Sequence, residues 1–258
     1  MLLAIRASGR RFVLSKGIMQ QGQKPSSPRT ELQMARSMCW HCQSEISGEY
    51  FCERCVKVQP VSKETDYFTC LGLPRRLNID LDRLEARFYE LSRMFHPDFY
   101  QNKTETERAI SLNNSALLNT AYRTLKDPVQ RAEYLLRLEA GSAKEIRTSP
   151  PADLFEEILA LQEDLEEFRS ASSDRPPDEL ESLRAKLEAD RKTLDRRRAE
   201  MEARLFELFT AWDALQDRGE ATDQLRKERD AILKEMREIL SNRTYVSNIV
   251  SDLVSTIG

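Results

Sequence analysis

Four cysteines arranged as two Cys-x-x-Cys pairs have the clearest chemistry in this sequence. Cys39 and Cys42 form the first pair, and Cys52 and Cys55 form the second, with nine residues between the pairs. The gap within each pair lets both sulfurs reach one metal ion at about 2.3 Å, and four thiolates complete a tetrahedral shell. The sequence therefore predicts a structural zinc site with no open catalytic position, in a segment whose folding requires the metal.

The same spacing is compatible with three other uses of the cysteines. These are two disulfides in a secreted protein, a redox-active dithiol, and a rubredoxin-like iron site, so iron is not excluded. Cys70 lies beside Phe68 and Leu71 in an apolar stretch, which indicates a buried, reduced thiol and not a ligand. His41 stands between two ligands and is interpreted as a bystander, because four sulfurs already fill a structural site.

The tripeptide His96-Pro97-Asp98 is the second group of side chains with evident chemistry. It follows an apolar stripe with spacings of three, four, three and four, made of Leu81, Leu84, Phe88, Leu91 and Phe95. These spacings place the stripe on one helix face, and Pro97 disfavours helical backbone at His96. The sequence predicts an imidazole and a carboxylate displayed on a contact loop, with an ordinary helix stop and turn as the alternative.

Helices are expected on both sides of this loop. Asp66 and Asp80 can cap a short first helix and a second helix, and a third helix is expected from about Thr104 to Lys126, antiparallel to the second. A further helix, capped by Asp127, is expected to end at Gly141. The tripeptide would then protrude between two antiparallel helices.

The tripeptide and its flanking sequences, Tyr67–Leu73 and Asn119–Pro128, resemble a J-domain. This resemblance implies a DnaK-type chaperone as partner, whose ATPase is contacted by His96, Pro97 and Asp98 and is stimulated to hydrolyse ATP. The chain itself would then be an ATPase activator and not an enzyme. Phe99 departs from the Lys that many J-domains carry at that place.

The C-terminal part has the apolar periodicity of long helices. Leu154, Ile158, Leu161, Leu165 and Phe168 recur at spacings of four, three, four and three, which indicates a buried face. Phe155, Leu159 and Gln162 lie beside this face as a candidate docking strip. Two longer helical stripes follow, so the predicted architecture is an antiparallel three-helix bundle.

Arg131–Leu136, placed after the J-like region and before an acidic helical part, is similar to the HscB family of iron–sulfur assembly co-chaperones. With the four-cysteine module, the chain resembles the branch that includes animal mitochondrial proteins. The resemblance implies that the bundle binds the iron–sulfur cluster scaffold protein, through Phe155, Glu156, Leu159, Ala160, Glu163 and the facing aromatic Tyr245. Ala160 stands where a Glu is common. The alternative is that Phe155 and Tyr245 are ordinary core residues.

Charge and hydropathy restrict the other classes of partner. The chain has 258 residues, 32% of them charged, and a formal net charge of -3, which gives no overall attraction to nucleic acid. No run of about 18 apolar residues predicts a membrane span. The run Arg196–Arg198 is surrounded by the acids Asp195, Glu200 and Glu202 and is interpreted as a solvated face. Only one basic residue, Arg54, lies between Cys39 and Cys55, which disfavours a nucleic-acid-binding zinc ribbon.

The predicted fold is mainly α, with a small zinc-ribbon-like module, a J-domain helical hairpin and a C-terminal three-helix bundle. The expected boundaries are a basic extension at 1–37, the metal module at 38–60, a J-domain with brace helix at 66–141, a linker at 142–151 and an acidic bundle at 152–258. A general J-domain co-chaperone with other clients, whose bundle serves homo-oligomerisation, is the alternative function.

The basic extension bears on where the protein works. Residues 1–37 hold seven Arg or Lys against the single acid Glu31, and residues 1–16 resemble an organellar presequence. An upstream start codon in a bacterial gene is the alternative, with Met19 or Met34 as the true start. Either reading predicts a reducing intracellular compartment, with the bacterial cytoplasm favoured over the mitochondrial matrix.

Overall fold

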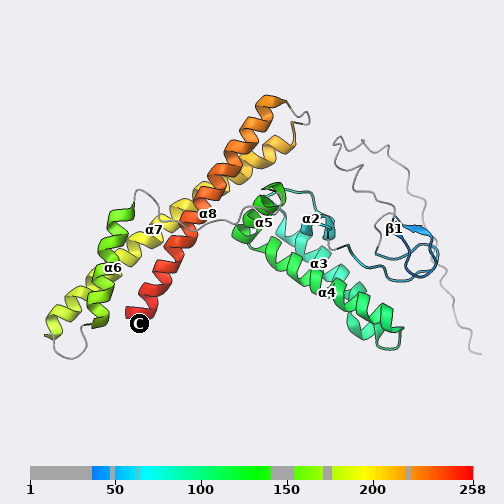
Figure 1. Ribbon diagram of the computed structural model, residues 1–258, viewed down its shortest axis with the longest axis horizontal. Helices are drawn as coiled ribbons and strands as arrows, with labels where there is room; N and C mark the ends of the chain where they lie inside the picture. The colour runs from blue at the N-terminus through cyan, green and yellow to red at the C-terminus, as the bar shows by residue number, and fades with distance from the viewer. Residues whose placement is uncertain are drawn as a thin grey trace, which may run out of the picture. The chain divides into compact units, whose positions relative to one another are not determined.

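The computed structural model describes residues 37–46, 50–62, 64–140, 154–170, 176–218 and 222–257. Residues 1–36 of the predicted basic extension, the predicted helix end at Gly141 and the predicted linker 142–151 lie outside the described residues. Helices dominate the described part, so the mainly α prediction is confirmed (Figure 1). Within the described residues, no helix combines the length and the apolar character needed to cross a membrane.

The cysteine-rich segment contains the only strands among the described residues. Strand β1 (Ser37–Met38) pairs antiparallel with β2 (Glu45–Ile46), and an isolated bridge joins Phe51 to Val58. Each of these pairings encloses one turn with two cysteines. Gln43 and Val56, the residues that follow the second cysteine of each pair, adopt positive φ angles of 56° and 59°. A left-handed residue at this place lets the chain fold back around the sulfurs.

The J-like region begins with two capped helices. Helix α2 (Tyr67–Cys70) starts where the Asp66 carboxylate accepts the Thr69 N–H, and the chain turns away at Gly72, whose φ is +65°. Helix α3 (Leu81–Phe95) starts at Asp80, whose side chain accepts two backbone N–H groups. Both caps satisfy donors that a helix N-terminus leaves unpaired, as the sequence predicted.

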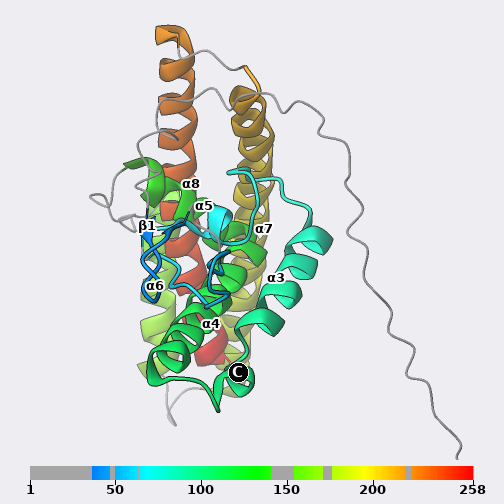
Figure 2. The ribbon, with the colours of Figure 1, turned by 90° about the vertical axis from the view of Figure 1, so that its right-hand side faces the viewer.

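A short 3-10 helix, η1 (Pro97–Tyr100), connects α3 to α4 (Glu105–Lys126). Thr104 and Glu107 form a reciprocal capping box at the start of α4. Helix α5 (Pro128–Ala140) follows at once, with Asp127 accepting the Gln130 N–H at 2.8 Å. Helices α3 and α4 run side by side in both views (Figures 1 and 2) and share a core that includes Leu84, Leu91, Phe95, Leu118 and Leu125.

The C-terminal part consists of α6 (Phe155–Ser170), α7 (Pro177–Gln216) and α8 (Asp223–Ile257). Figure 1 shows α7 and α8 as one long hairpin. Ion pairs cross between the helices, among them Lys186–Asp164 at 2.6 Å from α7 to α6 and Arg243–Glu202 at 2.7 Å from α8 to α7. The buried stripe predicted on α6 forms one core with α7 and α8, made of Leu154, Ile158, Leu161, Leu165, Leu187, Leu194, Val246, Ile249, Val250, Leu253 and Ile257.

This bundle buries only part of the predicted α7 stripe, which differs from the expectation that one bundle buries it all. Leu205, Leu208 and Trp212 belong instead to the core that contains Leu135 and Leu136 of α5. The reason is length, because a helix rises 1.5 Å per residue, so 16-residue α6 covers about 24 Å of an α7 that is about 60 Å long. The remaining apolar stripe of α7 packs against the J-like region.

Candidate chaperone-contact loop, metal centre and docking strip

The tripeptide lies where the sequence placed it, at the C-terminal end of α3. His96 has extended backbone angles, φ -60° and ψ 124°, because Pro97 follows it. The His96 side chain is 51% exposed and that of Asp98 is 70% exposed. His96 Nδ1 accepts the Asp98 N–H at 3.3 Å, so the neutral ring carries its proton on Nε2. The loop therefore presents an N–H donor and a carboxylate to solvent.

The base of the loop is held by contacts that the sequence did not predict. Ser111 and Ser115 on α4 both donate their hydroxyls to the carbonyl of Phe95, at 2.7 and 2.8 Å. The Tyr100 hydroxyl donates to the Met94 carbonyl at 3.0 Å. These bonds satisfy carbonyls that the end of α3 leaves unpaired. Serines one turn apart on the facing helix were the available signal, but they also fit an ordinary polar face.

Phe99, the residue that departs from the J-domain pattern, is also on the surface. Its side chain is 67% exposed, and its ring lies 6.1 Å from the His96 ring, centroid to centroid, in an edge-on arrangement. An aromatic face therefore stands beside the imidazole where a lysine is usual, which changes the contact chemistry from charge to apolar surface.

The four predicted ligand cysteines come together in one cluster. Their sulfurs all lie within 4.8 Å of one another, and the Cys39–Cys55 and Cys42–Cys52 pairs are 3.6 Å apart. A tetrahedron with metal–sulfur bonds of about 2.3 Å has edges of about 3.8 Å, so the sulfur positions fit one zinc-sized ion. Cys39 and Cys52 are buried, and the exposed His41 takes no part in the cluster.

Neighbouring polar groups point at the sulfurs. The Ser44 hydroxyl lies 3.1 Å from Cys42 Sγ and 3.2 Å from Cys52 Sγ, and Gln59 Nε2 donates to Cys39 Sγ at 3.4 Å. Hydrogen bonding from Ser44 lowers the pKa of Cys52 to about 6, whereas burial raises the pKa of Cys55 to about 12. Four thiolates this close repel one another unless a cation lies between them.

Cys70, the fifth cysteine, is buried and lies outside the cluster, as predicted for a structural thiol. Burial raises its pKa to about 11, so the thiol stays protonated at neutral pH.

The predicted docking strip lies on the outer face of α6. Phe155 is 55% exposed and Leu159 is 50% exposed, whereas Leu154 and Ile158 are buried. Glu156, Ala160 and Glu163 are exposed as well. The alternative that Phe155 is an ordinary core residue is therefore wrong, while Tyr245 is partly buried against the bundle core. The strip offers two apolar side chains flanked by acids.

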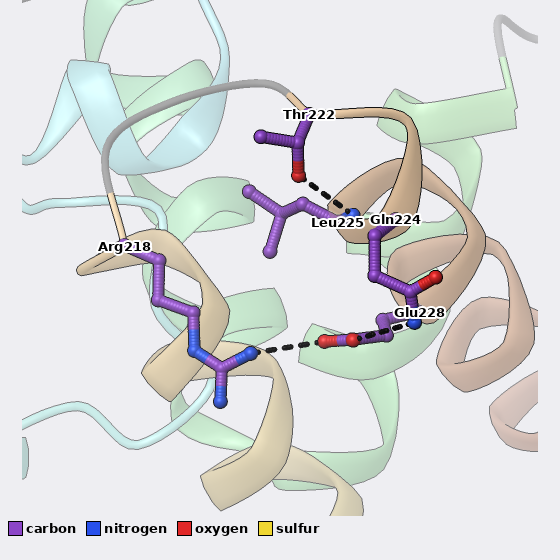
Figure 3. Close-up of a pocket in the computed structure, with 5 residues that line it drawn as sticks. All are labelled: Arg218, Thr222, Gln224, Leu225 and Glu228. Atoms are coloured by element: carbon purple, nitrogen blue, oxygen red, sulfur yellow. Dashed lines mark hydrogen bonds and ion pairs between the residues drawn. The ribbon is translucent and has the colours of Figure 1, made fainter.

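A pocket at the end of the hairpin where α7 ends and α8 begins contains none of the predicted site residues (Figure 3). Arg218 and Glu228 line it and pair with each other at 3.0 Å, and Thr222 Oγ1 accepts the Leu225 N–H at 3.2 Å. The lining side chains bond to one another, as at a helix start, and do not converge on a ligand.

Residues 66–134 match the DnaJ domain. The co-chaperone protein HscB of Proteus mirabilis is 33% identical over 182 residues, which are 70% of this chain and 98% of that protein. The chain belongs to the HscB family. Mouse iron-sulfur cluster co-chaperone protein HscB is 34% identical over 153 residues, which are 57% of this chain and 64% of that protein.

An Arabidopsis thaliana homologue of HscB is 33% identical over 135 residues, 52% of this chain and 53% of that protein. The chain thus spans less than two thirds of the length of the mouse and Arabidopsis relatives in these matches. The crystal structure of human HscB has a TM-score of 0.58 at 24% identity, covering 85% of this chain and 98% of that one, which shows a shared fold. The shared fold agrees with membership of the HscB family.

Within this HscB-type chain, the Arg197 and Arg198 side chains pair with Glu200 and Asp195 on the same helix, at 3.4 and 2.7 Å. Both partners lie three residues away and offset two of the three arginine charges, which supports the interpretation of the run as a solvated face.

Proposed function

We propose that this protein stimulates ATP hydrolysis by a DnaK-type chaperone and delivers the iron–sulfur cluster scaffold protein to it. The observation that carries the proposal is the exposed His96-Pro97-Asp98 loop in a member of the HscB family, whose named relatives are iron-sulfur cluster co-chaperones. The protein performs no bond chemistry of its own. Its loop contacts the ATPase, and its α6 strip holds the scaffold.

The exposed strip supports the second half of the proposal. Phe155 and Leu159 are two large apolar side chains on one helix that the bundle leaves half exposed. A partner that covers them gains the free energy of burying apolar surface, about 25 cal/mol per Å². Glu156 and Glu163 flank them and would steer a basic surface of the scaffold protein into place. Tyr245 is proposed as the aromatic contact from α8.

Zinc is the proposed metal of the cysteine cluster. The four Sγ atoms form a closed all-sulfur set, which suits a structural zinc ion, and all five cysteines are free thiols. A four-thiolate metal site requires reduced cysteines, which agrees with the proposed reducing intracellular compartment. Metal analysis of the purified chain is expected to give one zinc per chain.

Single-turnover ATP hydrolysis by the cognate chaperone tests the loop. We expect the parent protein to accelerate hydrolysis and His96→Gln to lose this acceleration while keeping its far-ultraviolet circular dichroism. Phe99 is adjacent and exposed, so Phe99→Ala tests whether any change in the loop lowers the acceleration of ATP hydrolysis or only a change in the tripeptide. A His96→Gln variant that stimulates as well as the parent would remove the first half of the proposal.

Titration of the scaffold protein, followed by calorimetry, tests the strip. Phe155→Ala and Leu159→Ala are each expected to weaken binding about tenfold or more, the usual range for an apolar side chain at an interface centre. Phe206→Ala on α7 is the matched control, because Phe206 is also an exposed aromatic, at 43%. Equal affinities for the Phe155 and Phe206 variants would contradict the assignment of α6 as the docking face.

A further inference from the structure

The metal-binding segment makes specific contacts with both helices that flank the tripeptide loop. The residues responsible lie next to the second cysteine pair, with Tyr50 two residues before Cys52 and Lys57 two residues after Cys55. Neither contact follows from metal binding alone, because a four-sulfur site needs only its cysteines. The contacts therefore indicate a role for the segment in the J-domain itself.

Tyr50 contacts the end of α3, directly before the tripeptide. Its ring packs edge-on against Phe95 at 5.3 Å between centroids and 76° between planes, and Phe95 immediately precedes His96. The Tyr50 hydroxyl donates to the carbonyl of Cys70 at 2.7 Å, at the end of α2. One aromatic side chain thus links the cysteine segment to the helix end from which the loop departs.

Lys57 contacts the beginning of α4, directly after the loop. Its Nζ lies 2.9 Å from Glu107 Oε1, and the Glu107 side chain is only 5% exposed. Glu107 is also the acid of the capping box, where its other carboxylate oxygen accepts the Thr104 N–H and hydroxyl. A buried carboxylate that loses its cation is costly, so Lys57 helps to keep the first turn of α4 in place.

A third contact attaches the segment about two turns further along α4. The Asn114 side chain, which is 3% exposed, accepts the Val61 N–H at 3.0 Å and donates to the Gln59 carbonyl at 2.9 Å. A buried amide with both ends paired fixes the backbone that it bridges.

Hydrogen bonds to the cysteine residues set the positions of Lys57 and Gln59. The Lys57 carbonyl accepts the Cys52 N–H at 2.9 Å and the Gln59 side-chain amide at 2.7 Å, and the same amide donates to Cys39 Sγ at 3.4 Å. Without a metal, the four sulfurs lose the ion that closes the cysteine turns. Tyr50 and Lys57 would then no longer be held in position to contact α3 and α4.

We propose that the metal-bound segment braces the His96-Pro97-Asp98 loop by holding the end of α3 through Tyr50 and the start of α4 through Lys57. Metal binding and the geometry of the loop are thereby coupled, although the cysteine cluster supplies no side chain to the tripeptide. The consequence for chaperone stimulation rests on the proposed function, whereas the brace itself concerns only this chain.

Amide hydrogen exchange of the full, metal-loaded chain tests the brace. Lys57→Met is expected to keep its metal content and to lower protection in the first turn of α4, at Glu107 and Arg108, by about tenfold. Amides of α8 serve as the internal reference. Arg54→Met is the control, because it removes an exposed basic side chain from the same cysteine turn. Chelation of the metal from the parent is expected to deprotect the same amides.

A double-variant cycle separates the ion pair from general damage. If Lys57 acts through Glu107, the effects of Lys57→Met and Glu107→Gln on α4 protection are non-additive, and the double variant exchanges more slowly than Lys57→Met alone. Additive effects would overturn the role of the pair. Removal of the metal with unchanged exchange in α4 and at the loop would overturn the brace as a whole.

The two proposals fail in different ways. A His96→Gln variant that stimulates ATP hydrolysis as well as the parent would contradict the proposed function. Amide hydrogen exchange would then still test the brace. If His96→Gln is inactive as expected, the chelated parent and Lys57→Met should both stimulate less than Arg54→Met. Unchanged stimulation together with faster exchange would overturn the functional consequence of the brace.

Discussion

Asp213 on α7 is the single polar side chain whose loss should most weaken the joint between the J-domain and the α7–α8 hairpin. Its two carboxylate oxygens accept the N–H groups of Leu77 and Asn78, at 2.8 Å each, in the loop before α3. Arg131 on α5 donates to the Leu77 carbonyl, also at 2.8 Å. The Leu77 N–H is thus bonded to α7, and the Leu77 carbonyl is bonded to α5.

The cost of Asp213→Ala can be worked out from the burial of the two donors. Leu77 is fully buried, so its N–H would be left without a partner at about 1–3 kcal/mol. Asn78 is exposed, and its N–H can turn to water at a net loss of about 0.5–1.5 kcal/mol. The free energy of unfolding should therefore fall by about 2–4 kcal/mol, which lowers Tm by about 5–15 °C for a chain of this size.

Urea unfolding followed by tryptophan fluorescence and circular dichroism measures this loss, because Trp212 is buried beside Asp213. Asp217→Ala is the matched control. Asp217 pairs with Arg76 of the same loop, but these side chains are 60% and 41% exposed, so the pair should contribute less than about 1 kcal/mol. If the Asp213 and Asp217 variants lose equal stability, the reasoning from buried donors is refuted.

Three further predictions concern single side chains. Val56→Gly should stabilise the metal-bound protein by up to about 1 kcal/mol in thermal unfolding, because an exposed β-branched residue is strained at φ 59° and glycine is not. Burial alone would raise the pKa of Asp66, but hydrogen bonds from Thr69 and Arg75 lower it below 3.8. The ionised Asp66 carboxylate therefore stabilises the folded state above pH 4, and this contribution disappears as the pH falls through the lowered pKa. Asp66→Asn should make the free energy of unfolding less dependent on pH in the acid range, as measured by unfolding at several pH values. Cys70 should resist alkylation at pH 8 until the chain unfolds, because burial raises its pKa to about 11, and rapid labelling of the folded chain would contradict this.

The sequence predicted those features that depend on local rules. The caps at Asp66, Asp80 and Asp127 follow from which side chains can accept a helix N–H, and each is in place. The cysteine spacing allowed one shared ion, and the four sulfurs are close enough to hold it. The exposed position of the tripeptide followed from a proline at a helix end. Such rules need only neighbours in the chain.

Features that depend on long-range packing escaped prediction. The apolar stripe of α7 was continuous in the sequence, so nothing in it marked where α6 stops covering it and the J-domain core begins. Asp213 looked like one acid among many on an acidic helix, yet it is 7% exposed and bonds a loop more than a hundred residues away. Lys57 and Glu107 are likewise ordinary charges whose pairing appears only in three dimensions.

The packing of α7 changes how the two proposed binding faces can work together. If only residues 142–151 joined the J-domain to the bundle, the linker length would set the effective concentration of a bound scaffold at the chaperone. In the structure, Leu208 and Trp212 of α7 share a core with α5, and Asp213 bonds the loop before α3. A joint with buried polar bonds favours one arrangement, because a shift would leave the Leu77 N–H without a partner. Loosening that joint with Asp213→Ala should therefore leave each binding face intact and reduce the stimulation gained from adding scaffold more than the stimulation measured without it.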